Sequence, residues 1–351
     1  MRVVVVGATG NVGTSLLHAL AGDPAVDSVL GVARRLPSTS FPKTEWAAAD
    51  VASDPLEPLF AGADAVVHLA WLIQPSRRES VTRAVNVEGS ARVFRAAGKA
   101  GVGALVYASS VGAYSPGPKD RFVDESWPTN GVPTSFYSRH KAEVERLLDR
   151  FEREFPAVRS VRLRPGLIFK REAASEIRRY FAGPFLPSFA VRPGLIPVVP
   201  DVERLRFQAV HSMDVGEAYR LAVVNPEARG AYNVAADPVL DPAELASLLH
   251  ARRVRMSAAT LRRAAAVTWR LRLQPSPEGW VDMALGVPLM DTSRVRSELG
   301  WTPHRSAGGA LLDLLAGMRD RAGAETPPLH PRAGGVLRVR ELLTGLGSSR
   351  R

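Results

Sequence analysis

Three glycines near the N-terminus, Gly7, Gly10 and Gly13, have the spacing G-x-x-G-x-x-G. In a turn from a strand to a helix, the first glycine permits a sharp bend, the second lets a pyrophosphate approach the backbone, and the third lets the helix pack closely on the strand. The free N–H groups and the dipole at the start of that helix favour a bound phosphate. The spacing therefore predicts a dinucleotide-binding turn, with a glycine-rich turn of another α/β protein as the alternative.

The elements that would position this turn alternate between strand and helix. Four valines at 3–6 are typical of a strand buried on both faces, and residues 14–20 place apolar side chains on one side of a helix. Further strands are predicted at 28–33, 65–69, 101–108 and 160–163, and long helices at 77–100 and 135–155. This alternation predicts an α/β fold with a right-handed, doubly wound parallel sheet that binds ligands at the carboxyl edge of its strands.

The end of the second strand indicates which dinucleotide would bind. An acidic residue at this point would hold the ribose hydroxyls, but Ala33 stands there and Arg34 and Arg35 follow it. Arginine can bind a 2′-phosphate that an acid would repel, so the sequence favours NADP over NAD as the cofactor. A solvated pair of loop arginines is the alternative. A further short strand is predicted just before Asp50, between the strands at 28–33 and 65–69, and Asp50 could accept a hydrogen bond from the adenine amino group or could cap a helix.

A family resemblance rests on motifs spread along residues 1–320. Besides the glycines, these motifs are His68-Leu69-Ala70, Asn86-x-x-Gly89, Ser109-Ser110-x-x-x-Tyr114, Tyr137-x-x-x-Lys141, Arg164-Pro165, Val210-His211, Asp214-Val215, Tyr232-Asn233-Val234 and Leu299-Gly300-Trp301-x-Pro303. With them the chain resembles the extended short-chain dehydrogenase/reductase family, and within it the NAD-dependent epimerase/dehydratase branch. The resemblance implies an NAD(P)-dependent oxidoreductase with a Rossmann-type sheet and a smaller C-terminal substrate-binding lobe.

The resemblance also implies a catalytic group of serine, tyrosine and lysine, which falls on Ser110, Tyr137 and Lys141. Tyr137 and Lys141 are one helical turn apart and project from the same face. A phenol with a pKa of about 10 is a poor base, but an ammonium about 4 Å away would stabilise its anion by about 4 kcal/mol at an effective dielectric near 20. Tyr137 would then serve as acid and base in reversible hydride transfer at a carbinol or carbonyl carbon, with Ser110 at the reacting oxygen.

Binding residues are expected on both sides of this group. The expected dinucleotide contacts are Gly7, Thr9, Gly10, Asn11, Val12, Gly13, Arg34, Arg35, Asp50, Val51, Leu69, Ala70, Trp71, Asn86, Tyr137, Lys141 and Pro165. The expected substrate contacts are Ser110 and Arg206, the latter near where such enzymes bind a diphosphate, although Arg206 could equally be solvated. The family pattern is broken near this site at Trp71, Ser115 and Phe169-Lys170. These departures make the substrate less predictable from the family than the type of reaction.

Three functions are compatible with these residues. The first is an epimerase or related oxidoreductase acting on a small molecule such as a nucleotide sugar; the 4,6-dehydratase subclass is disfavoured because Ser110-Val111-Gly112 lacks its acid pair. The second is an NADPH-dependent reductase of a small carbonyl substrate, for which the apolar stretch 181–200 would form a pocket wall. The third is a non-catalytic dinucleotide-sensing protein, although such proteins usually lack the tyrosine or the lysine.

The composition narrows the partners and the location. The net charge is +11, but most of the 46 basic residues are arginines without interleaved aromatics, so we expect no specific nucleic-acid partner. The chain has no cysteine, which excludes disulfides and thiolate metal sites, and no His/Asp/Glu cluster has metal-ligand spacing. It enters its first strand at once and has no apolar run of about 18 residues, so we expect a cytoplasmic protein with no signal peptide and no membrane association.

The chain should divide into three regions. Residues 1–165 form the expected dinucleotide-binding domain, to which 207–235 would return. Residues 166–206 and 236–320 form the expected substrate-binding lobe, with 245–273 helical and basic on one side, and 321–351 form a basic, poorly ordered tail. The resemblance also implies a homodimer that pairs through the helices at 77–100 and 135–155.

Overall fold

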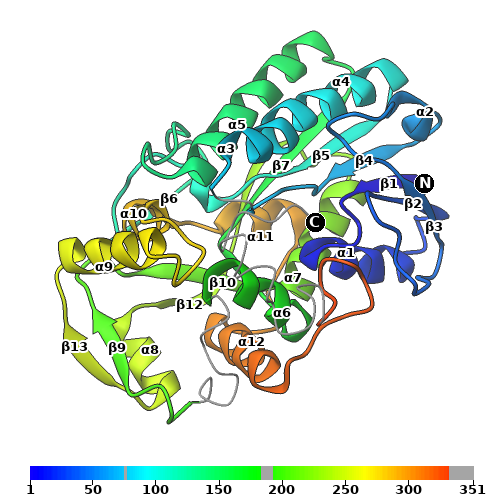
Figure 1. Ribbon diagram of the computed structural model, residues 1–351. Coiled ribbons are helices and arrows are strands. Elements are labelled where there is room, and N and C mark those ends of the chain that lie inside the picture. The colour runs from blue at the N-terminus through cyan, green and yellow to red at the C-terminus, as the bar shows by residue number, and fades with distance from the viewer. Residues whose placement is uncertain (75–76, 183–192, 332–351) are drawn as a thin grey trace.

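A seven-stranded parallel sheet forms the centre of the protein in the computed structural model, which describes residues 1–74, 77–182 and 193–331 (Figure 1). Its strand order is β11-β7-β5-β4-β1-β2-β3. The strands are β1 (Arg2–Val6), β2 (Ser28–Ala33), β3 (Thr44–Ala48), β4 (Ala65–His68), β5 (Ala104–Ala108), β7 (Arg159–Pro165) and β11 (Gly230–Val234). The chain winds outward in opposite directions from the β1/β4 boundary, so the predicted doubly wound α/β fold is confirmed.

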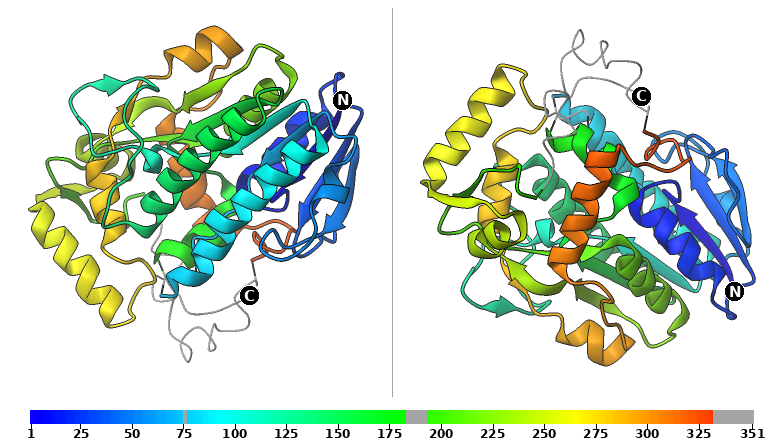
Figure 2. Two further views of the ribbon diagram at one scale, coloured as in Figure 1. Left: turned by 90° about the horizontal axis from the view of Figure 1, so that it is seen from above. Right: turned by 90° about the horizontal axis from the view of Figure 1, so that it is seen from below.

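Helices cover both faces of this sheet. One face carries α2 (Glu57–Phe60), α3 (Glu79–Arg83), the π-helical η1 (Ala84–Gly89), α4 (Ser90–Ala100) and α5 (Phe136–Glu154); the other carries α1 (Asn11–Ala21), α7 (Ser212–Val224) and α11 (Ser293–Leu299). Figure 2 shows α4 and α5 side by side across their face. Alternation along β1 fills both cores, because Val3 and Val5 pack with the α1 and α7 side chains while Val4 and Val6 pack with those of α4 and α5.

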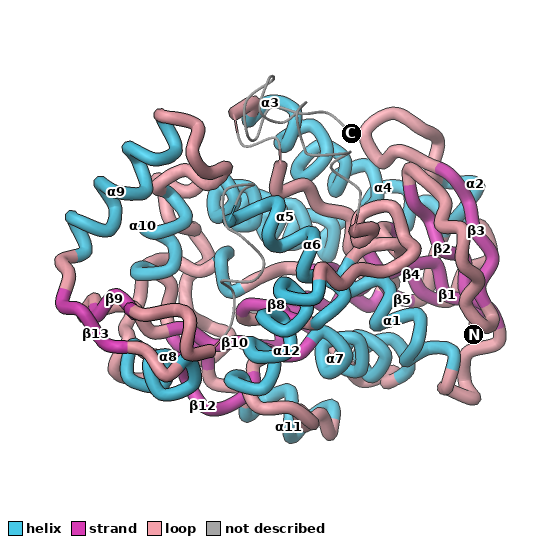
Figure 3. Tube along the Cα trace, turned by 60° about the horizontal axis from the view of Figure 1, so that its bottom comes forward, coloured by secondary structure: helices cyan, strands magenta, loops and turns pink. Residues whose placement is uncertain are grey.

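A smaller lobe lies beyond β7 and β11, and Figure 3 shows its elements gathered on the side away from β1, β2 and β3. Three small sheets belong to it: β8 (Leu167–Phe169), β10 (Phe207–His211) and β12 (Ala236–Leu240); β9 (Val198–Asp201) and β13 (Arg252–Arg255); and β6 (Phe122–Val123) with β14 (Leu289–Met290). Its helices are η3 (Arg171–Ala173), α6 (Ala174–Ile177), η4 (Arg178–Ala182), α8 (Pro242–Leu249), α9 (Ala258–Arg270), α10 (Gly279–Gly286) and α12 (Ala307–Asp320), whereas the short η2 (Val111–Ala113) follows β5 and packs on α5.

Two expectations about this lobe need correction. The stretch 245–273 is not one helix: α8 ends where His250 takes a left-handed conformation with φ 53, and β13 separates it from α9. The stretch 207–235 does not return as a whole to the main sheet. Its strand β10 pairs with β8 and β12, whereas α7 packs on α1 and β11 pairs with β7.

The end of the described chain packs against the body of the protein. Thr326 and Leu329 are buried, and Ser38 Oγ donates a hydrogen bond to the Glu325 carbonyl oxygen at 3.5 Å. The rest of the expected tail, 332–351, and most of the expected pocket wall, 183–192, lie outside the described residues. Among the described helices, none has the length and apolar character needed to cross a bilayer.

Candidate active site

The turn from β1 to α1 requires glycine at two of its three glycine positions. Gly7 has φ +90, and a Cβ there would lie 2.6 Å from the Ala70 backbone nitrogen. A Cβ at Gly13 would lie 2.5 Å from the Ala8 carbonyl oxygen. A Cβ at Gly10 would meet only the Gly7 carbonyl oxygen, at 3.5 Å, so this side of the turn is open to an approaching group.

The start of α1 offers the donors that a phosphate needs. Gly10 occupies the N-cap and no side chain caps this end, so the first-turn N–H groups have no acceptor within the helix. Asn11 begins this helix, and its Nδ2 donates a hydrogen bond to the Ile168 carbonyl oxygen at 3.4 Å. Thr9 and Val12, also expected contacts, lie in the same turn and first helical turn. These features fit the pyrophosphate of a dinucleotide.

A buried lysine adds charge beside this turn. Lys170 Nζ donates hydrogen bonds to the Asn11 carbonyl oxygen at 2.8 Å, to Thr14 Oγ1 at 2.6 Å and to Ser15 Oγ at 3.1 Å. Burial lowers the pKa of Lys170 to about 8, against the opposing effect of Glu172. Its positive charge therefore reinforces the positive end of the α1 dipole.

Arginines lie where the adenosine part of a dinucleotide is expected to bind. Arg34 and Arg35 directly follow β2 and are exposed. Partial burial, followed by repulsion from Arg34 and Arg179, lowers the pKa of Arg35. The charge of Arg179, from η4, therefore acts on Arg35 and adds to the positive charge at the carboxyl end of β2.

The residues after β3 have structural partners. Asp50 Oδ1 accepts a hydrogen bond from the Ala52 backbone at 2.9 Å, so this carboxylate stabilises a local turn. Val51 is buried against η1, where a Cβ on Gly89 would lie 2.7 Å from Val51 Cγ2. These contacts hold the loop after β3 against the helical layer.

The segment after β4 is held in place by one buried amide. Asn86 is fully buried; its Oδ1 accepts from the Leu72 backbone nitrogen at 2.7 Å, and its Nδ2 donates to the Leu72 carbonyl oxygen at 2.8 Å. These two hydrogen bonds occupy both ends of the amide. Asn86 therefore positions the backbone of Leu69, Ala70 and Trp71 at the edge of the sheet.

Ser110, Tyr137 and Lys141 meet at the carboxyl end of β5. Ser110 follows β5 and its Oγ accepts a hydrogen bond from the Gly112 backbone at 3.0 Å, while Tyr137 and Lys141 stand one turn apart on α5. The Ser110 hydroxyl also forms a hydrogen bond with the Tyr137 phenol. Lys141 Nζ donates to the Ala108 carbonyl oxygen at 2.6 Å and lies 5.8 Å from the centre of the Tyr137 ring.

The electrostatics of this group differ from the sequence-based expectation. Burial raises the pKa of Tyr137 to about 12, opposed by the hydrogen bond with Ser110. Burial lowers the pKa of Lys141 well below its usual range, opposed by the negative charge of Glu145. The expected net lowering of the phenol pKa is therefore not found, since burial raises that pKa and also disfavours the charged form of Lys141, whose Nζ donates to the Ala108 carbonyl oxygen. Tyr137 is consequently a protonated phenol at neutral pH.

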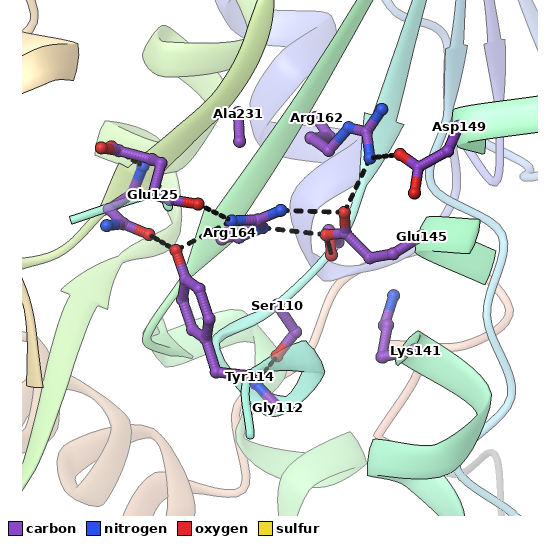
Figure 4. Close-up of polar contacts among 12 residues, drawn as sticks. Ser110, Gly112, Tyr114, Glu125, Lys141, Glu145, Asp149, Arg162, Arg164 and Ala231 are labelled. Atoms are coloured by element: carbon purple, nitrogen blue, oxygen red, sulfur yellow. Dashed lines mark hydrogen bonds and ion pairs between the residues drawn. The ribbon is translucent and has the colours of Figure 1, made fainter. Parts of the chain in front are cut away.

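A buried ionic network lies behind Lys141. Glu145 is one turn beyond Lys141 on α5, and Arg164 donates to both of its carboxylate oxygens at 2.9 Å (Figure 4). Arg162 and Ser109 add hydrogen bonds at 3.0 and 2.5 Å. Burial alone would raise the pKa of Glu145, but Arg164 and Arg162 outweigh it and hold the value at about 2. A permanent carboxylate therefore lies on the Lys141 side of α5.

The same network extends to the loop after η2. Arg164 Nη1 donates to the Tyr114 hydroxyl at 3.0 Å and to the Glu125 carbonyl oxygen at 2.8 Å. Tyr114 donates in turn to Asn233 Oδ1 at 2.6 Å. The network therefore joins α5, β7, β11 and the loop that leads from Ser110, which fixes these elements around the carboxyl end of β5.

Aromatic rings surround the Tyr137 phenol. The centre of the Trp71 ring lies 5.8 Å from that of Tyr137 and 3.5 Å from Lys141 Nζ. On the lobe side, Trp280 of α10 lies 5.0 Å from Tyr137 and 4.9 Å from Phe181. The surroundings of the phenol are thus apolar and aromatic.

The remaining predicted residues lie further out. Pro165 ends β7 and pairs with Val234 of β11. Arg206 Nη1 donates to the Lys119 carbonyl oxygen at 2.6 Å, and Lys119 Nζ donates back to the Arg206 carbonyl oxygen at 2.7 Å. The structure therefore brings together the glycine turn, the 69–71 segment and the residues Ser110, Tyr137 and Lys141. Arg206 is instead hydrogen-bonded to the loop that carries Lys119. Within the described residues, no group of His, Asp or Glu side chains could hold a metal ion.

Sequence reasoning missed two residues of the site, Glu145 and Trp280. Glu145 had a signal, because residues 137, 141 and 145 repeat at the four-residue spacing of one helix face. No sequence signal pointed to Trp280. This residue belongs to a helix more than a hundred residues from Tyr137 in the chain, and only the packing of the lobe brings the two rings together.

Comparison with known proteins agrees with this geometry. Residues 3–235 match the family described as "NAD dependent epimerase/dehydratase family". The chain belongs to this family. The expectations of an enzyme and of the epimerase/dehydratase branch are thereby confirmed.

Similar proteins were found by sequence and by structure. An uncharacterized protein of Mycobacterium tuberculosis is 27% identical over 325 residues, which are 92% of this chain and 31% of that protein, so the chain spans about a third of its relative's length. The UDP-glucose 4-epimerase of Thermus thermophilus, solved with NAD, is 20% identical with a TM-score of 0.66 over 91% of this chain and 99% of that chain. A UDP-glucuronic acid 4-epimerase variant from Bacillus cereus, solved with a UDP-sugar and NAD, is 15% identical with a TM-score of 0.67 over the same shares. At these identities, the structural likeness establishes the fold.

Proposed function

We propose that the protein is an NAD(P)-dependent oxidoreductase in which hydride transfer to a carbonyl carbon is coupled to proton donation by Tyr137. The observation that carries this proposal is the convergence of Ser110, Tyr137 and Lys141 at the same sheet edge as the open glycine turn. A bound reduced nicotinamide would supply the hydride. The phenol supplies the proton, so that one hydride and one proton convert the carbonyl group to a carbinol.

Each residue has a role that follows from its position. Tyr137 is protonated at neutral pH and donates its proton to the carbonyl oxygen as negative charge develops there. Ser110 holds the phenol and shares the reacting oxygen, since its hydroxyl already forms a hydrogen bond with Tyr137. Lys141 is positioned by Ala108 beside the site, and the negative charge of Glu145 favours its charged form.

The residues present fit a dinucleotide, and we propose NADP as the preferred one. The glycine turn and the uncapped α1 would hold the pyrophosphate, with Lys170 adding charge nearby. Arg34 and Arg35, with Arg179 close to Arg35, would bind a 2′-phosphate at the adenosine end. A solved protein of the same fold contains NAD, so the proposed preference for NADP rests on the arginines of this chain and not on the structural comparison.

The aromatic surroundings favour net carbonyl reduction of an apolar substrate. Trp71 and Trp280 border the phenol with apolar surface, and Arg206, the expected diphosphate anchor, is engaged with Lys119. Epimerisation of a nucleotide sugar is the second candidate, favoured by the substrates for which the structurally similar epimerases are named. In that reaction the hydride would return to the same carbon, with no net oxidation of the dinucleotide.

An absorbance assay at the reduced-nicotinamide band tests the proposal. Purified protein is mixed with NADPH and a panel of apolar ketones and aldehydes, and separately with UDP-sugars whose epimers are separated by chromatography. Net loss of NADPH with a carbonyl, abolished in Tyr137→Phe while dinucleotide binding persists, supports reduction. Epimer formation without net loss of NADPH supports the second candidate. Full activity of the Tyr137→Phe variant would overturn the assignment of the proton donor.

A further inference from the structure

The segment 251–274 has an unusual charge composition. It contains seven arginines and no aspartate, glutamate or lysine. Its helix α9 lies at the outer edge of the lobe in both views of Figure 2, and Figure 3 places β13 on the same edge. The proposed reaction makes no use of this surface.

The inner side of α9 is anchored to the rest of the lobe. Ala266 is buried, and Arg262 forms an ion pair with Asp282 of α10 at 2.8 Å. The Arg77 guanidinium lies 4.3 Å from the centre of the Trp269 ring and covers it. These contacts fix which side of α9 faces solvent.

The outer side of α9 combines arginine with aliphatic side chains. Arg263, Val267, Arg270 and Leu271 recur at helical spacing and are exposed, Val267 by 47% and Leu271 by 65%, and Leu273 follows with 47%. Neither Arg263 nor Arg270 forms an ion pair with any residue that the structure describes. We name this outer surface, formed by Arg263, Val267, Arg270, Leu271 and Leu273, the α9 surface.

We propose that the α9 surface binds the anionic surface of a lipid bilayer, which departs from the sequence-based expectation of no membrane association. Exposed aliphatic side chains among arginines, with no acidic residue in the segment, are what an interfacial helix needs: the aliphatic groups enter the acyl boundary while the guanidinium groups contact lipid phosphates. The α9 surface has no aromatic side chain to stack on bases, which disfavours a nucleic acid. A second copy at this surface would place like charges together.

The position of α9 gives this binding a consequence for the candidate site. Arg262 attaches α9 to α10, and α10 carries Trp280, whose ring lies 5.0 Å from that of Tyr137. The α9 surface is therefore on the lobe that supplies the aromatic edge of the site. An enzyme held at a bilayer by α9 would have this edge near the source of an apolar substrate. The lipid binding itself does not depend on the proposed reaction.

Vesicle co-sedimentation of the full chain tests the proposal. Phosphatidylcholine vesicles with and without phosphatidylglycerol are compared at low and high salt, using the wild type and the double variant Arg263→Glu/Arg270→Glu. We expect binding to require the anionic lipid and to weaken by at least about tenfold in the variant. The double variant Leu271→Ser/Leu273→Ser should retain binding at low salt and lose the part that survives high salt.

The matched control is Arg146→Glu/Arg150→Glu, which makes the same charge change at two exposed positions of α5. It should bind vesicles almost as well as the wild type. Equal loss in the control, equal binding to both vesicle types, or no vesicle binding would each overturn the proposal.

Two further measurements address other occupants of the α9 surface. If the protein bound a DNA or RNA oligonucleotide more tightly than vesicles, and Arg263→Glu/Arg270→Glu lost this binding, the partner of the α9 surface would be a nucleic acid and the proposal would be overturned. If light scattering showed a dimer that only this variant disrupts, the partner of the α9 surface would be a second copy of the chain, which would also overturn the proposal. Circular dichroism and thermal unfolding identify any variant that fails to fold, and single Arg263→Gln and Arg270→Gln variants would then take its place.

Discussion

The Lys141 ammonium lies 3.5 Å from the centre of the Trp71 indole ring, on a segment that Asn86 holds in place. This is a close cation–π contact for a lysine that is only 3% exposed. The ring partly replaces the solvation that the ammonium loses on burial. Trp71 thus links the segment after β4 to helix α5.

Replacing this ring should destabilise the protein in proportion to the lost interaction. We expect Trp71→Leu to lower the free energy of unfolding by about 2 kcal/mol, because both packing and the cation–π contact are lost. Trp71→Phe keeps an aromatic face and should cost less. Urea unfolding of the two variants measures the difference, and equal losses would mean that the ring contributes packing alone.

The buried carboxylate of Glu145 should govern stability at acid pH. Its pKa is lowered from 4.5 to about 2 in the folded protein, so its contribution is fully present above pH 4.5 and is lost as the pH falls towards about 2. Glu145→Gln leaves Arg164 and Arg162 without their shared partner and should cost about 3 kcal/mol at neutral pH.

Urea unfolding at a series of pH values tests this prediction. The difference in unfolding free energy between wild type and Glu145→Gln should shrink between pH 4.5 and about 2. Asp149→Asn is the control, since Asp149 also pairs with Arg162 but is 48% exposed and should matter little. A difference that does not change with pH would contradict the ionised state of Glu145.

The raised pKa of Tyr137 should set the pH profile of carbonyl reduction. The reaction needs the protonated phenol, so kcat/KM should stay level through the neutral range and fall only as the pH rises towards about 12. Ser110→Ala removes the hydrogen bond that opposes the raised pKa, and should lower kcat without moving the fall to lower pH. A fall in the wild-type profile near neutral pH would show that the phenol ionises much more easily than its burial implies.

Alanine substitutions at Gly10 and Gly13 should have different effects on stability and on dinucleotide binding. Gly10→Ala places its Cβ no closer than 3.5 Å to another atom, so the variant should fold normally while its methyl group blocks a pyrophosphate. Gly13→Ala meets the Ala8 carbonyl oxygen at 2.5 Å and should lose stability as well. Thermal unfolding with and without dinucleotide distinguishes these effects. Unchanged NADPH binding by Gly10→Ala would exclude this turn as the phosphate site.

The arginines after β2 should discriminate between the two dinucleotides. Arg34→Asp places an acid beside the proposed 2′-phosphate, so the Kd for NADP should rise by at least about tenfold while the Kd for NAD changes little. Titration calorimetry with both dinucleotides measures this. Arg95→Asp, an exposed arginine on α4, is the control for a general charge effect. Equal weakening of both dinucleotides by Arg34→Asp would argue against a contact with the 2′-phosphate.

The sequence by itself determined the elements whose signal is local. Four valines followed by spaced glycines specify a buried strand and a tight turn, and β2 has the predicted bounds of 28–33. The four-residue spacing of Tyr137 and Lys141 specifies their shared helix face. These features depend on backbone conformation and on periodicity, which neighbouring residues fix.

Only the tertiary structure decided what surrounds those residues. Glu145 became a permanent carboxylate because β7 brings Arg162 and Arg164 to it, and the phenol remained protonated because burial outweighs its single hydrogen bond. His250 ended a helix that periodicity alone would have continued. Burial and charge act through space, so their balance at Tyr137 and Lys141 depends on side chains that come from distant parts of the chain.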